Sequence, residues 1–246
     1  MTEQTNTELL AALDAAAAEL LRHLPPLTDA QAAAPSRLPG WSRGHVLAHL
    51  AGVCAAMARQ VEYAERGETI EFYDGGMDGR NQAIERGALR SAAEHREVLA
   101  RGTGQVLDRF RALDQAGWAA PISYRGGTVR DGAEALWREL VIHLSDLDIG
   151  VDPDTWTPAF AEHLFSFLSA RVPDDLRLRL QPLGHLPRTI GGGARTVSVN
   201  GMATDIAAWL AGRQPSLDSL RADADADADG VALPVLLPWP AGIPQR

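Results

Sequence analysis

Lysine is absent from this chain of 246 residues, and all 23 of its basic side chains are arginine. They face 32 acidic residues, so the formal net charge is −9. A protein that binds nucleic acid or an anionic membrane surface usually presents a basic stripe, and this charge balance argues against both partners. Arginine in place of lysine can reflect codon composition, so it predicts no function by itself.

Cysteine and long apolar runs are equally scarce. Cys54 is the one cysteine, which excludes an intramolecular disulfide. No stretch reaches 18 uninterrupted apolar residues, and the first residues lack the basic start and apolar run of a signal peptide. Hydrophobic residues make up 46% of the chain, which is enough for a packed core. We therefore expect a folded cytoplasmic protein without a membrane span.

Four long helical patterns occupy the first part of the chain. They cover residues 7–24, 43–66, 80–113 and 128–147. Ser42 and Thr128 are good N-caps for the second and fourth helices, and Gly102 and Gly104 can break or kink the third. Four helices of this length with few strand patterns predict a four-helix bundle over residues 1–152.

Composition changes after Pro153. The expected elements are a helix over 155–170, strands over 176–180 and 196–199, and a short helix over 202–210. The Ala-Asp repeat at 222–230 is expected to be a solvated loop, and the Pro-rich apolar tail an edge strand. Residues 153–246 therefore read as a smaller α+β domain.

Two chemically active residues lie on the fourth predicted helix. Glu139 and His143 are four residues apart, so they share one helix face, within or beside its apolar stripe. A glutamate that faces a core is costly unless it is paired or binds a metal. An ordinary Glu–His pair at the boundary of the core explains the same spacing.

A histidine on the second predicted helix strengthens the metal interpretation. His49 lies on an apolar side with Val46, Leu50 and Val53, where a lone histidine is usually a satisfied core residue. Together with the Glu-x-x-x-His pair, however, it can supply a third ligand at one point of a bundle. Two imidazoles and a carboxylate suit zinc or non-haem iron. His45 is ranked as a helix-terminus residue or a support for a ligand.

The chain also resembles a known family. The similar segments are LPGWSRGHVLAHLA, GRNQAIERGALRSA, LWRELVIHLSDLDIG and VNGMATDIAAWLAGR. In this order they resemble the mycothiol-dependent maleylpyruvate isomerases, whose wider group shares a DinB-like helical bundle. The first segment is typical of the superfamily, and its combination with the last is more specific.

The resemblance implies a site as well as a fold. It implies a zinc ion held by His49, Glu139 and His143, with mycothiol as the thiol cofactor. It further implies an active-site arginine in the second domain, and Arg213 is the best matching position. A cation that closes the end of a helix explains Arg213 equally well. Arg80 is a second candidate for binding an anionic group of the cofactor.

The family reaction converts maleylpyruvate to fumarylpyruvate in the gentisate pathway of aromatic catabolism. A thiolate adds to the alkene, the resulting single bond rotates, and the thiolate leaves; a metal favours the thiolate form. Cys54 looks like a small buried hydrophobe rather than this nucleophile. Asp146 and Asp148 either orient ligand imidazoles or occupy a solvated helix end, and the second interpretation is preferred.

Two other functions remain open on the same scaffold. One is a mycothiol-dependent S-transferase that acts on electrophiles, since metal ligands report thiol activation and not the substrate. The other is a non-catalytic metal-binding protein. In each enzymatic case the partners are a small-molecule substrate and a low-molecular-weight thiol, and the sequence leaves the oligomeric state undetermined.

Overall fold

The structure is a computed structural model that describes residues 4–224 and 227–240. The chain divides into two compact units, Met1–Val151 and Asp152–Arg246, and each is described by itself. The described part of the first unit is helical apart from two isolated β-bridges, and the second combines helices with a five-stranded sheet. The expected fold class, a helical bundle with a smaller α+β domain, is confirmed.

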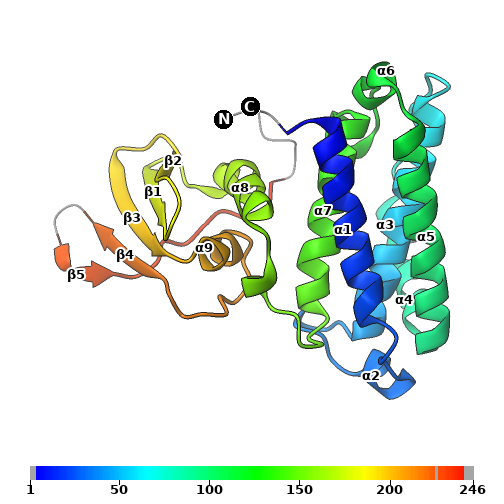
Figure 1. The fold of residues 1–246 in the computed structure, drawn as a ribbon, viewed down its shortest axis with the longest axis horizontal. Helices are drawn as coiled ribbons and strands as arrows, with labels where there is room; N and C mark the ends of the chain where they lie inside the picture. Colours follow the sequence, from blue (N-terminus) through cyan, green and yellow to red (C-terminus); the bar gives the residue numbers. More distant parts are fainter. Residues whose placement is uncertain (1–3, 225–226, 241–246) are drawn as a thin grey trace. The chain divides into compact units, whose positions relative to one another are not determined.

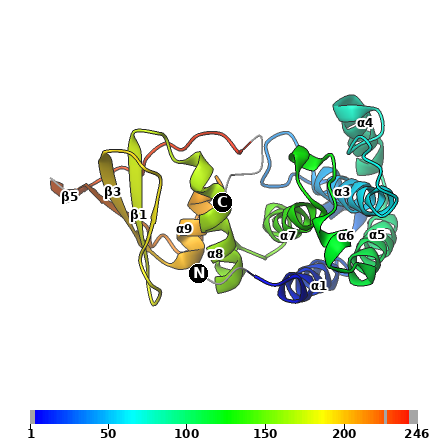
Figure 2. The same ribbon diagram turned by 90° about the horizontal axis from the view of Figure 1, so that it is seen from above.

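In the described part of the first unit, four long helices form the bundle, as Figures 1 and 2 show. They are α1 (Asn6–His23), α3 (Arg43–Ala64), α5 (Ala92–Ala112) and α7 (Val129–Asp146). Helices α1 and α3 each pack against both α5 and α7, so the four surround one core. Leu13, Leu47 and Leu136 are fully buried there. The connections contain α2 (Asp29–Ala33), α6 (Gln115–Ala119) and a 3-10 turn, η1 (Tyr124–Gly126).

The prediction of a single helix over residues 80–113 is wrong. Two helices occupy this region, α4 (Gly76–Ala88) and α5. The break lies at Ser91, whose side chain accepts a hydrogen bond from the amide of Glu94 while the Glu94 carboxylate accepts one from the Ser91 amide. This capping box begins a new helix. Helix α5 then runs without a break through Gly102 and Gly104.

The second unit begins with helical segments and continues with a sheet. Its helical elements are η2 (Pro153–Thr155), α8 (Pro158–Phe167), η3 (Leu168–Arg171) and α9 (Ala203–Leu210). Its strands are β1 (Leu176–Pro182), β2 (Arg188–Ile190), β3 (Arg195–Gly201), β4 (Arg221–Ala224) and β5 (Asp227–Val231). They are ordered β2-β1-β3-β4-β5, with only β1 and β3 parallel among the paired strands. Helix α9 packs on β1 and β3.

The prediction that the Ala-Asp repeat at 222–230 forms a solvated loop is also wrong. Strands β4 and β5 pair there, and residues 225–226 lie outside the described part of the chain. Alternation with period two places Ala222 on the buried face and Asp223 on the exposed one, which is a strand pattern.

The edge strand expected in the C-terminal tail does not form over residues 232–240, and residues 241–246 are not described. No helix within the described ranges is long and apolar enough to span a membrane.

Candidate metal centre

Helix α3 positions the first residue of the site. Ser42 caps its start and accepts a hydrogen bond from the His45 amide, while the Ser42 amide donates to Nδ1 of His45 at 3.2 Å. His45 thereby completes the helix terminus, as the sequence predicted. His49 follows one turn later on the buried side of the helix, next to the fully buried Leu50.

Helix α7 positions the other two residues of the site, Glu139 and His143. Thr128 and Asp131 form the capping box that begins it. Glu139 and His143 lie one turn apart further along the same helix, on the side that meets α3.

The three predicted ligands meet at one point. The Oε2 atom of Glu139 lies 2.8 Å from Nε2 of His49 and 3.0 Å from Nε2 of His143. One ligand atom from each residue can be chosen so that all three lie within 4.8 Å of one another. The exposed fraction of the side chain is 7% for His49, 14% for His143 and 30% for Glu139. The cluster is therefore largely buried but keeps an accessible side at the carboxylate.

Asp146 supports His143 from the next turn of the helix. Its Oδ2 lies 2.8 Å from Nδ1 of His143, and its side chain is only 1% exposed. The preferred interpretation of Asp146 as part of a solvated helix end is therefore wrong. Asp148 does lie at such an end, with a side chain that is 50% exposed and bound to Arg37 and Arg43.

The electrostatics of the cluster hold a carboxylate between two imidazoles. Burial disfavours the charge of Glu139, yet hydrogen bonds from His143 and His49 keep its pKa well below the usual range. Burial also opposes protonation of His143, but hydrogen bonds to Asp146 and Glu139 raise its pKa to about 9. Burial lowers the pKa of His49, against the opposing effect of Glu139.

Arg80 lies directly beside this cluster, in a frame of aromatic rings. Its Nη2 is 3.2 Å from Nδ1 of His49, and its guanidinium carbon lies 6.0 Å from the centre of the Trp41 ring and 5.8 Å from that of Tyr73. Both distances are in the range of cation–π contacts. Burial raises the pKa of Tyr73 to about 12, so its phenol remains protonated. Sequence reasoning found Arg80 but missed Trp41 and Tyr73, because aromatic residues in loops carry no spacing signal.

The donor set fits a divalent metal. Because the Asp146 carboxylate accepts from Nδ1 of His143, Nε2 is the nitrogen that faces the cluster, as in carboxylate–histidine–metal arrangements. At His49, an arginine N–H can only donate to Nδ1, which places the ring proton on Nε2. A neutral imidazole that binds a metal through Nε2 carries this proton on Nδ1 instead, so metal binding would require the contact between Arg80 and Nδ1 to open. Two imidazoles and one carboxylate match the donors of catalytic zinc sites.

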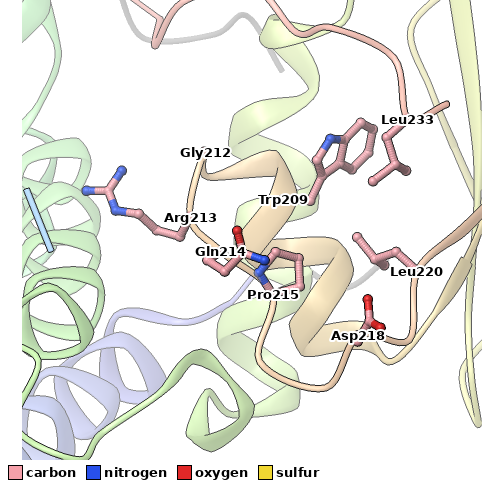
Figure 3. Close-up of a pocket in the computed structure, with 8 residues that line it drawn as sticks. All are labelled: Trp209, Gly212, Arg213, Gln214, Pro215, Asp218, Leu220 and Leu233. Carbon is pink, nitrogen blue, oxygen red and sulfur yellow. The ribbon is translucent and has the colours of Figure 1, made fainter.

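Arg213 lies in the second unit, directly after α9. Its amide donates to the Ala208 carbonyl at 2.8 Å, and its Nη1 donates to the Ala211 carbonyl at 3.1 Å. It also lines a cavity of about 480 Å³ together with Trp209, Gln214 and Asp218. Figure 3 shows its guanidinium pointing away from Trp209 and Asp218. These contacts agree with a helix-closing role.

Cys54 is completely buried on α3, and burial raises the pKa of its thiol to about 12. A thiol in this environment is a poor nucleophile. The interpretation of Cys54 as a small buried hydrophobe is confirmed.

The fold and the cluster define a helical-bundle protein with a two-histidine, one-glutamate site between two of its helices. The family model described as the mycothiol maleylpyruvate isomerase N-terminal domain matches residues 13–148. The chain therefore belongs to this family, which confirms the resemblance found in its sequence.

Solved structures agree with the fold. The crystal structure of the mycothiol-dependent maleylpyruvate isomerase is similar to this chain with a TM-score of 0.79 and 20% sequence identity, covering 91% of this chain and 96% of that one. A histidine-to-alanine mutant of that enzyme gives the same values. No curated protein sequence matches this chain.

Proposed function

We propose that this protein is a mycothiol-dependent cis–trans isomerase that converts maleylpyruvate to fumarylpyruvate through thiolate addition, rotation and elimination. Family membership supports a thiol-dependent enzyme, and the observation that carries the proposal is the convergence of His49, Glu139 and His143 within 4.8 Å. We propose that these three residues hold a divalent metal, with zinc as the preferred ion. When bound, the metal would stabilise the thiolate form of the thiol.

The residues of this chain would perform separate tasks in the reaction. Asp146 holds the ring of His143 in a fixed orientation, and its 1% exposure keeps this contact away from water. Arg80 carries a permanent positive charge beside His49, and its planar guanidinium is suited to an anionic group of the cofactor. We assign Arg213 the task of binding a substrate carboxylate, for which the arginine fork gives a bidentate contact.

The test combines metal analysis with turnover. The purified protein is loaded with Zn²⁺, supplied with mycothiol and maleylpyruvate, and assayed for fumarylpyruvate by chromatography. Glu139→Ala is expected to lose metal and turnover while its helical circular dichroism is retained, because the carboxylate contributes to the site and keeps part of its surface accessible. Glu134→Ala, on the same helix but outside the cluster, is the matched control and should retain both.

The outcomes separate the three candidate functions. Bound metal without turnover of maleylpyruvate, together with conjugation of mycothiol to other electrophiles, would replace the isomerase by an S-transferase. Bound metal with neither turnover nor conjugation would leave a non-catalytic metal-binding role, and a wild-type protein that retains no metal would contradict the proposed centre. Unchanged metal content in Glu139→Ala would show that the centre is not built from these ligands.

A further inference from the structure

The loop before α3 is folded onto itself. We refer to residues 35–43 as the 35–43 loop. Pro35 and Ser42 form an isolated β-bridge, and the Ser36 amide donates to the Trp41 carbonyl at 2.9 Å. The Arg43 amide donates to the Ala34 carbonyl at 2.9 Å. These bonds give the loop a defined shape at the point where α3 begins.

The same loop is hydrogen-bonded to the C-terminus of α7, the helix that carries Glu139 and His143. The Arg37 amide donates to the Asp146 carbonyl at 2.9 Å. Arg43 donates from Nε to the Leu147 carbonyl at 2.6 Å and from Nη2 to the Asp148 carbonyl at 2.8 Å. The last carbonyls of a helix have no hydrogen-bond partner within the helix and attract cations. The bonds from Arg37 and Arg43 supply the missing donors.

Both connected helix ends carry the proposed ligands. Arg43 is the first residue of α3, and His49 lies six positions later. Leu147, the C-cap residue of α7, lies four positions after His143. The loop also touches the cluster itself, because the Trp41 ring meets the His49 ring edge-on at 5.6 Å between centroids.

We propose that Arg43 is a positioning residue for the metal centre: it joins the start of α3 to the end of α7 and so fixes the separation of His49 and His143. The inference rests on the metal centre proposed above. Within the described part of the chain, the hydrogen bonds of the Arg43 side chain go to none of the three ligands, so it acts through the helices.

The geometry explains why one side chain has this effect. The Arg43 side chain is 15% exposed and also donates to the Gln31 carbonyl at 3.3 Å, so it is held by carbonyls on two sides. Without it, the Leu147 and Asp148 carbonyls that follow α7 lose this donor, and we expect the last turn of the helix to become more mobile. Metal sites tolerate distance errors of only about 0.2 Å, so a small shift of His143 weakens binding.

The experiment compares two arginines of the same bundle. Arg43→Ala removes the proposed connection. Arg96→Ala is the matched control, because Arg96 also donates from α5 to a backbone carbonyl, that of Leu27 at 3.1 Å, but does not reach α7. The Zn²⁺ dissociation constant is measured by competition with a chromophoric chelator, the visible absorption of bound Co²⁺ reports the coordination geometry, and the melting temperature of the chelated protein reports the fold.

Arg43→Ala is expected to weaken Zn²⁺ binding at least about tenfold and to alter the Co²⁺ spectrum, whereas Arg96→Ala should stay within about twofold of the wild type. Equal weakening by both variants, or none by either, would overturn the proposal. Arg43→Lys keeps the charge but not the fork, and its affinity should lie between those of the wild type and Arg43→Ala.

Arg43→Lys also decides the matter if Arg43→Ala does not fold. In that case a wild-type affinity and spectrum in Arg43→Lys would overturn the role of the forked contact. A wild-type protein that binds neither Zn²⁺ nor Co²⁺ would instead contradict the metal centre, so the two failures are distinguishable.

Discussion

The residues around His143 show how an imidazole is prepared for a metal. Asp146 lies three positions along the helix, where its carboxylate reaches Nδ1 without a distortion of the backbone. The carboxylate fixes the tautomer and leaves Nε2 directed at Glu139. Loss of such a supporting residue typically lowers metal affinity about 10–100-fold.

Asp146→Asn tests this support. The amide oxygen can still accept from Nδ1, but the negative charge that strengthens the bond is lost. We expect Zn²⁺ affinity to fall about 10–100-fold, measured by chelator competition, with little change in helical content. Glu134→Gln, on the same helix but outside the cluster, should leave the affinity near that of the wild type. An unchanged affinity in Asp146→Asn would contradict the role given to this residue.

Arg213→Lys separates the two roles considered for Arg213. A lysine still places a cation at the end of α9, so a helix-closing role predicts wild-type turnover and stability. A bidentate contact with a substrate carboxylate is lost, which costs about 1.5–3 kcal/mol, or roughly 10–100-fold in kcat/KM. We expect this loss in steady-state kinetics with an unchanged melting temperature. Wild-type kinetics would contradict the role of Arg213 in binding the substrate.

Among the residues of the site, spacing identified those on regular helices. His49, Glu139 and His143 were found because helical periodicity places them on apolar faces. The partners Trp41 and Tyr73 were not found, since they reach Arg80 from loops whose course depends on packing across the bundle. Asp146 is a candidate support for His143 in the sequence, but only the fold shows that its side chain is buried at the last turn of α7.

At the scale of elements, local capping signals proved more informative than glycines. The Ser91-x-x-Glu94 capping box divides the region that periodicity joined into one helix, whereas Gly102 and Gly104 lie inside α5 without interrupting it. The Ala-Asp repeat was misread because aspartate is rare in strands, although its period of two already indicated one. Periodicity therefore predicted the number of long helices in the bundle better than it predicted where they end.

The crossing of α3 and α4 requires a residue without a side chain. A Cβ atom at Gly44 would lie 2.5 Å from the Ala88 carbonyl oxygen, where real Cβ contacts are essentially never found. We expect Gly44→Ala to destabilise the bundle by about 1–3 kcal/mol, because the backbone of α4 must move. A lower thermal midpoint, followed by circular dichroism, would show it.

Gly52→Ala on the same helix is the control for that measurement. A Cβ atom there meets nothing within 4 Å, so only helix propensity changes. This variant should raise the midpoint, since alanine is favoured over glycine in a helix by about 1 kcal/mol. Equal shifts in both variants would mean that the α3–α4 contact is looser than described.

At the scale of the whole molecule, the two units hold their polar groups in different ways. The bundle buries His49 and Asp146 at the proposed metal centre, whereas the α+β unit buries a carboxylate that organises the chain. Asp205 on α9 is fully buried and accepts hydrogen bonds from the amides of Ser216, Leu217 and Ser219. This loop follows Arg213 and precedes β4, so Asp205 shapes part of the cavity wall.

We expect Asp205 to make the stability of the α+β unit depend on pH in the acidic range. Burial raises the pKa of its carboxyl group, but the hydrogen bonds from Ser219, Leu217 and Ser216 lower it below the ordinary value of 3.8. A carboxyl group whose pKa is lower in the folded state stabilises that state above the unfolded pKa. This contribution is therefore complete above pH 3.8 and is lost as the pH falls through the lowered value.

Asp205→Asn removes the charge and tests that dependence. At pH 7 we expect faster amide exchange over residues 214–220 and a loss of about 1–3 kcal/mol in the unfolding free energy of the unit, because hydrogen bonds to a charged acceptor are weakened. The gap between variant and wild type in urea midpoints should narrow as the pH falls below 3.8. Asp175→Asn, at an exposed ion pair with Arg195, provides the comparison and should change little at either pH. A gap that stays constant with pH would mean that the ionised form of Asp205 does not hold the loop.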